Sequence, residues 1–227
     1  GAAEYADELD ETSRDLLDAA KADAETFGVP VETHTIISHR SFEEIFDAAR
    51  THDADLVVMG WGEDAHGSPG RAESAMDEVV GSVPCDFLVL RDRGFDASRI
   101  LVPTAGGPDS SLSADIARLL AEEYESEVTL LNVANEGERP AAEDFLERWA
   151  AEHDLADATL RVETGDVEAA IETAADEHTM LVIGATEKGL LSRLISGSLV
   201  LDVVDDVECS VVLAEKHRSR SVWQRLF

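Results

Sequence analysis

Lysine, cysteine and long apolar runs are scarce in this sequence. It has three lysines (Lys21, Lys188 and Lys216), and its 18 basic residues face 49 acidic ones, which gives a formal net charge of -31. A surface of this sign repels nucleic acid and anionic membranes, so neither is expected as a partner. Two cysteines are too few for a disulfide framework. Because the sequence has no signal peptide and no apolar stretch of about 18 residues, we expect a soluble, cytoplasmic chain.

The acidity does not indicate disorder, because 44% of the residues are hydrophobic and they fall in regular blocks. Abundant Asp, Glu, Ala and Val with little Lys resembles the composition of proteins from salt-loving archaea. In molar salt the Debye length falls to about 3 Å, which screens most of the self-repulsion of such a surface. The composition therefore predicts a folded, halophilic protein with a solvated acidic coat.

The chain repeats itself. "DADLVVMGWGED" (53–64) matches "EHTMLVIGATEK" (177–188), and Gly60 and Gly184, like Cys85 and Cys209, stand 124 positions apart. A constant offset indicates two copies of one domain-sized unit. We place the first copy at 1–94 and the second at 95–216, followed by a basic and aromatic tail at 217–227.

Each copy alternates helical and strand-like segments, which predicts an α/β fold with an open parallel sheet covered by helices on both faces. The second copy has five expected strands and the first has three. The counterpart of "RILVP" would fall before Gly1, so the first copy is expected to be truncated at its N-terminus. The expected helices are 4–27, 41–52, 72–80, 108–123, 140–152, 166–177 and 197–205; the expected strands are 31–37, 55–60, 86–90, 99–103, 127–133, 158–163, 179–184 and 209–214.

The segment "GATEKGLLSRLISGS" lies between an expected strand and an expected helix. Gly184 ends the strand, Lys188 supplies a cation, and Gly197 and Ser198 stand at the helix entry. Helix N-termini beyond the carboxyl ends of parallel strands bind phosphates, and glycine lets the backbone come close. The alternative is that Gly184 only turns the chain and Ser198 only caps a helix.

The order of elements, together with "IGATEKGLLSRLISGSLVLDVV", resembles the universal stress protein family, whose nucleotide-binding members carry G-x-x-G-x9-G-[ST] here. Gly184, Gly197 and Ser198 match this motif, but Glu187 replaces its second glycine. An aspartate near the nucleoside is replaced by Ala105. The first copy keeps Gly60 and Ser74 but has Glu63 and Glu73 at the glycine positions, so we expect it not to bind.

This resemblance implies a non-catalytic regulatory or stress-response module that self-associates through its copies or as a homodimer. Its second copy would hold a degenerate site for ATP or AMP, with Thr104 and Ala105 near the nucleoside, Val133 along the base, and Gly184, Lys188, Gly197 and Ser198 around the phosphates. Tandem copies containing "ILVPTAGGP" also resemble the cytoplasmic tails of haloarchaeal amino-acid and cation transporters, which makes a transporter membrane domain an expected partner.

Two alternatives stay open. One is a ligand-free dimerisation scaffold in which glutamates close both sites. The other is an adenylating enzyme, because "AGGPDSS" (105–111) resembles the S-G-G-x-D-S loop of ATP pyrophosphatases; Ala105 replaces its first serine and Pro108 removes an N–H from the loop. The scattered histidines predict no metal site, the matched Cys85 and Cys209 favour packing over catalysis, and weak ATP hydrolysis is left open.

Overall fold

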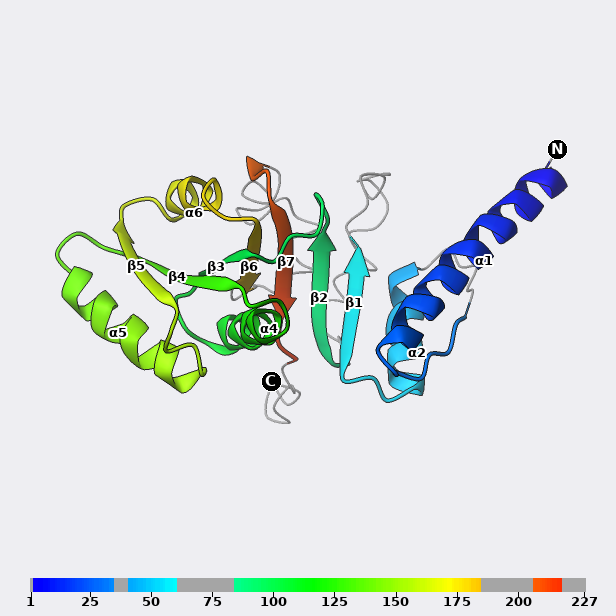
Figure 1. Ribbon diagram of the computed structural model, residues 1–227, viewed down its shortest axis with the longest axis horizontal. Coiled ribbons are helices and arrows are strands. Elements are labelled where there is room, and N and C mark those ends of the chain that lie inside the picture. Colours follow the sequence, from blue (N-terminus) through cyan, green and yellow to red (C-terminus); the bar gives the residue numbers. More distant parts are fainter. Residues whose placement is uncertain (1, 35–40, 61–83, 185–205, 218–227) are drawn as a thin grey trace, which may run out of the picture. The chain divides into compact units, whose positions relative to one another are not determined.

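The computed structural model describes residues 2–34, 41–60, 84–184 and 206–217 (Figure 1). The chain divides into two compact units, Gly1–Ile45 and Phe46–Phe227. The first unit consists mainly of helix α1 (Ala2–Thr26), and the boundary between the units falls within α2 (Ser41–Thr51). Gly28 has a φ of 72°, a left-handed conformation that glycine adopts at little cost, so α1 ends close to the expected residue.

The second unit is built on one seven-stranded sheet with the order β1-β2-β7-β6-β3-β4-β5. All neighbouring strands are parallel except β2 and β7. This confirms the α/β fold with a mostly parallel sheet. The strands are β1 (Leu56–Gly60), β2 (Asp86–Arg91), β3 (Arg99–Pro103), β4 (Glu127–Ala134), β5 (Thr159–Thr164), β6 (Met180–Gly184) and β7 (Ser210–Glu215); the helices after β3 are α4 (Pro108–Tyr124), α5 (Arg139–Glu152) and α6 (Val167–Ala175).

Helices cover both faces of the five strands of the second copy. In Figure 1, α4 and α5 lie on one side of the sheet and α6 on the other. Ile100 and Val102 on β3 point to the α4 and α5 side, where they join an apolar core cluster with Leu112 and Leu146. Leu101, between them in the strand, is fully buried on the opposite face. The sheet is therefore apolar on both faces, as the continuous Val, Leu and Ile runs predicted.

The two copies share this sheet through the antiparallel pair β2 and β7, in which Leu88 lies opposite Ala214. The connection between the copies is fixed at the same place. Buried Ser210, at the start of β7, donates a hydrogen bond from its hydroxyl to the carbonyl of Gly94 and accepts one from the backbone N–H of Arg93 (3.1 and 2.9 Å). The sequence indicated two copies, and the structure adds that their last strands pair edge to edge.

Equivalent strands of the two copies differ in burial. Val182 on β6 is fully buried between β3 and β7, whereas Val58, its counterpart on β1, is 60% exposed. Among the described strands β1 has one neighbour, β2. Within the part of the chain that the structure describes, the first copy thus leaves an apolar strand partly exposed where the second copy buries its counterpart.

One expected strand is not observed in its described part. Residues 31–34 form neither helix nor strand, and the rest of "VETHTII" lies outside the described residues. A strand needs a ladder partner, and the described part of the first copy has no counterpart of β4, which pairs with β5 in the second copy. The expected helices 72–80 and 197–205, and residues 218–227 of the tail, also lie outside the described residues. None of the described helices is long and apolar enough to cross a bilayer.

Candidate functional site

The loop after β3 is held rigidly against the end of β4. Thr104 is buried; its backbone N–H donates to the carbonyl of Leu131 (2.8 Å), and its own carbonyl accepts from the amide nitrogen of Asn132 (2.7 Å). Its hydroxyl accepts from the backbone N–H of Gly106 (3.1 Å). The φ angles of Gly106 and Gly107 are 84° and 91°, which require glycine, and α4 begins directly after them. This loop therefore has a fixed shape at the carboxyl edge of the sheet.

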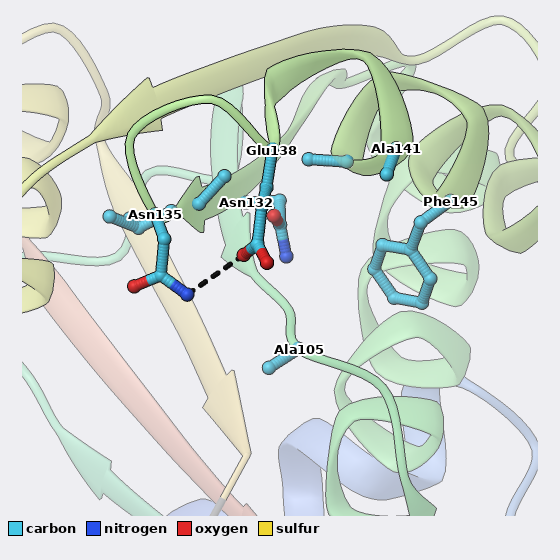
Figure 2. Close-up of a pocket in the computed structure, with 9 residues that line it drawn as sticks. Ala105, Asn132, Asn135, Glu138, Ala141 and Phe145 are labelled. Atoms are coloured by element: carbon cyan, nitrogen blue, oxygen red, sulfur yellow. Dashed lines mark hydrogen bonds between the residues drawn. The ribbon is translucent and has the colours of Figure 1, made fainter.

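An open cavity of about 410 Å³ lies beside this loop, and its size suits a small molecule (Figure 2). It is bounded by the loop after β3, the end of β4 and the first turns of α5. The cavity lies at the carboxyl ends of parallel strands, which is the edge at which open α/β sheets bind ligands. The described lining residues are Ala105, Asn132, Val133, Ala134, Asn135, Glu138, Ala141, Ala142 and Phe145.

The cavity has an apolar wall and a polar rim. Phe145 presents its ring on the α5 side, and a Cβ built on Gly106 would lie 3.5 Å from the ring, so the ring rests against the loop backbone. Where β4 leads into α5, the amide nitrogen of Asn135 donates to the Oε2 atom of Glu138 (2.8 Å). Glu138 comes immediately before α5 and is the one charged residue of the described lining. An aromatic ring and a hydrogen-bonded carboxylate thus face the same space.

Of the residues expected at the site, Ala105 and Val133 line the cavity. Thr104 lies directly beside it, but its side chain is buried and fixes the loop instead of lining the space. Lys188, Gly197 and Ser198 lie outside the described residues, as do Glu187 and the first-copy positions Glu63, Glu73 and Ser74. The phosphate-binding role of all four residues therefore stays a prediction, and Gly184 is the one of them that the structure describes.

Gly184 has a packing role at the end of β6. A Cβ built on it would lie 2.7 Å from the carbonyl carbon of Asp109 and 2.8 Å from the backbone nitrogen of Ser110. These are backbone atoms in the first turn of α4 and cannot easily give way. A Cβ on Gly60, the counterpart in the first copy, would meet no atom within 4 Å. Helix packing alone is thus enough to require glycine at 184.

Polar side chains of "AGGPDSS" are engaged inside the fold. Asp109 is buried, and its Oδ1 atom accepts the backbone N–H of Lys216 (2.8 Å), which ties α4 to the end of β7. The hydroxyl of Ser111 donates to the carbonyl of Gly107 (3.1 Å). Pro108 occupies the first helical turn, where its missing N–H costs nothing. In this loop the aspartate and the last serine stabilise the helix start.

Sequence reasoning missed Asn132, Asn135, Glu138 and Phe145. Asn132 lies at the end of the expected strand 127–133 and Asn135 just after it, so their position at its carboxyl end was a usable signal. Glu138 and Phe145 reach the cavity from α5, and only the packing of α5 against β4 and β5 brings them there. Among the described residues no group of three or more His, Cys, Asp or Glu could hold a metal ion.

The family of the chain follows from its sequence. Residues 1–91 and 97–215 each match the universal stress protein family. This chain belongs to that family. No curated protein sequence matches it.

Solved structures of the family share the fold. A universal stress protein from Archaeoglobus fulgidus is 17% identical with a TM-score of 0.65, covering 94% of this chain and 79% of its own. A putative universal stress protein from Pseudomonas aeruginosa is 16% identical with a TM-score of 0.57, covering 89% and 78%. A universal stress protein in complex with cAMP is 19% identical and covers 53% of this chain and 98% of its own, with a TM-score of 0.44. Likeness at these identities establishes the fold and places no ligand in this chain.

Proposed function

We propose that the second copy binds an adenine nucleoside or nucleotide in the cavity beyond β3 and β4, as the sensor of a non-catalytic regulatory module. The observation that carries the proposal is the cavity itself, in which the ring of Phe145 and the methyl groups of Ala105 and Ala141 form apolar surface for a flat base. The amides and backbone at the end of β4 offer hydrogen-bonding groups to its polar edge.

We also propose that this site is degenerate, which means that it lacks some of the residues expected in nucleotide-binding relatives. Ala105 supplies a methyl group where nucleotide-binding relatives are expected to carry a carboxylate, and no cation is present in the described lining. A site of this kind binds weakly, and a micromolar or weaker dissociation constant is expected. Weak binding suits a sensor of millimolar cellular nucleotides.

Calorimetric titration of adenosine, AMP, ADP and ATP in molar KCl, with and without magnesium, tests the proposal. Ala141→Trp should abolish binding, because Ala141 is exposed on α5 and lines the cavity, so an indole would fill it. Ala151→Trp is the matched control, since Ala151 is exposed on the same helix but does not line the cavity. Absence of heat and of thermal shift with every adenine compound would refute the proposal.

The structure also offers an observation in favour of the scaffold alternative. The antiparallel β2 and β7 pair joins the copies into one sheet through backbone pairing of their own strands. A scaffold would bind no adenine compound and would retain its association state when nucleotide is added. Sedimentation velocity with and without ATP, run beside the titration, separates the two functions.

We further propose that the module is halophilic and cytoplasmic and regulates a membrane transporter, on the strength of its acidic composition and the resemblance of "ILVPTAGGP" to transporter tails. The coding sequence on either side of this chain provides the test. Hydrophobic segments of about 20 residues there would support the link, and an adjoining reading frame without them would refute it. Release of pyrophosphate from ATP would instead support the adenylating enzyme.

A further inference from the structure

The carboxylate of Glu138 is placed to recognise something inside the cavity. Figure 2 shows it directed between the two walls, with Asn135 beside it and Ala105 across from it. The Asn135 amide donates one hydrogen bond to Oε2 (2.8 Å), which favours this orientation of the exposed carboxylate. A carboxylate offers about four acceptor positions, so one such bond leaves room for further donors.

A pair of neighbouring hydroxyl groups is the chemistry that such a carboxylate matches. Two parallel O–H donors on adjacent carbons can each bond one carboxylate oxygen, in the way that a guanidinium does. The opposite end of the cavity is apolar, with the Phe145 ring and Ala141. A ligand with a flat ring at one end and a vicinal diol at the other would satisfy both ends.

We infer that Glu138 is a specificity-determining residue which binds the 2′- and 3′-hydroxyls of a ribose, so that the site selects ribonucleosides over their deoxy analogues. This inference rests on the proposed adenine site and specifies which residue recognises the ribose. Ala105 leaves the opposite rim without a carboxylate, so the diol is read from the α5 side of the cavity.

The negative charge of Glu138 should also discriminate against ligands with a phosphate on the 2′- or 3′-oxygen. A phosphate on the 2′- or 3′-oxygen would remove a donor and bring a negative charge against the carboxylate. Cyclic AMP, whose 3′-oxygen is esterified, keeps a single free hydroxyl and should bind more weakly than AMP. A 5′-phosphate points away from the diol and is not excluded.

The test is a set of dissociation constants for adenosine, 2′-deoxyadenosine, 3′-deoxyadenosine, AMP and cyclic AMP, measured by calorimetry in molar KCl. The wild type should bind adenosine about tenfold more tightly than either deoxy analogue, the scale expected for a hydrogen bond to a charged group. Glu138→Gln should bring this ratio close to one, mainly by weakening adenosine. Glu136→Gln, an exposed glutamate that does not line the cavity, should leave the ratio unchanged.

A compensating variant separates recognition from folding. In the Glu138→Gln background, Ala105→Asp places a carboxylate on the opposite rim and should restore part of the preference for the diol. Equal affinity of the wild type for adenosine and its deoxy analogues, or a ratio unaffected by Glu138→Gln, would overturn the inference while leaving the adenine site standing. If no adenine compound binds the wild type, the proposed function fails, and the inference fails with it.

Discussion

The backbone of Asp109 lies so close to Gly184 that a Cβ on this glycine would stand 2.7 Å from the Asp109 carbonyl carbon. The first turn of α4 therefore rests directly on the end of β6. Gly184 is also the first glycine of the expected phosphate motif. A loss of affinity in a Gly184 variant could therefore come from a destabilised fold or from a lost ligand contact. The two effects need separate measurements.

Gly184→Ala should destabilise the protein by about 3 kcal/mol, because the added methyl overpacks against rigid backbone. Gly60→Ala is the matched control at the equivalent position, where a Cβ meets nothing within 4 Å, and it should change the free energy of unfolding by less than about 1 kcal/mol. Urea denaturation of both variants in molar KCl measures the difference. Equal effects of the two substitutions would contradict the packing role of Gly184.

Val58 and Val182 provide a second matched pair, on β1 and β6. Val182→Ala should cost about 2 kcal/mol, because a fully buried side chain loses two methyl groups and leaves a small cavity. Val58→Ala should stay within about 0.5 kcal/mol, since that side chain is 60% exposed. A large loss for Val58→Ala in the same denaturation assay would mean that β1 is covered in solution, for example by a second copy of the chain.

Much of the fold was predictable because local signals marked it. The expected strand at 99–103 coincides with β3, and 179–184 differs from β6 by one residue. The ends of these strands are visible in the sequence, because each apolar run ends at a glycine or a proline. The pairing of β2 with β7 has no local signal, because it joins strands more than a hundred residues apart. The absence of a strand at 31–34 has none either, because a strand there would need a pairing partner from elsewhere in the chain.

The site was predictable only in part, for a related reason. Ala105 and Val133 stand at strand ends, and strand ends of a parallel sheet meet at one edge whatever the loops do. Glu138 and Phe145 enter the cavity through the position of α5. Glu138 precedes this helix and Phe145 lies on it, and the sequence does not show which element that side of the helix packs against. The ligand-selective residue of the proposed site was therefore the one that sequence reasoning could not reach.

Both thiols should react slowly in the native protein. Burial raises the pKa of Cys85, and the carboxylates of Asp86 and Asp55 raise it further; burial is also the main cause of the raised pKa of Cys209. Less thiolate is then present at pH 8 than in an unfolded chain. With Ellman's reagent, native protein should react far more slowly than protein in urea, and the half-buried Cys209 should react before Cys85. Cys209→Ser should remove the faster phase, and an unchanged time course would contradict this order.

The same thiols contribute to pH dependence on the alkaline side. Because their folded pKa values lie above the ordinary value of 9.0, the unfolded chain ionises first as pH rises. Their contribution to stability is complete below pH 9.0 and declines as pH rises through the folded pKa. Cys85→Ser should therefore lose less stability between pH 8 and pH 10 than the wild type, measured by urea denaturation at each pH. A steeper loss in the variant would contradict the sign.

Salt should stabilise this protein strongly at low concentration and less at high concentration. With a formal net charge of -31, the folded state concentrates repulsion that an expanded chain relieves. Raising KCl from 0.1 to 1 M shortens the Debye length from about 10 to about 3 Å, which removes most repulsion between separate surface groups. The melting temperature should rise by about 5 °C or more over this range, and then level off. A rise that continues in proportion to KCl up to 4 M would indicate strengthened burial of apolar surface instead of screening, and a flat curve would show that the acidic coat exerts no strain on the fold.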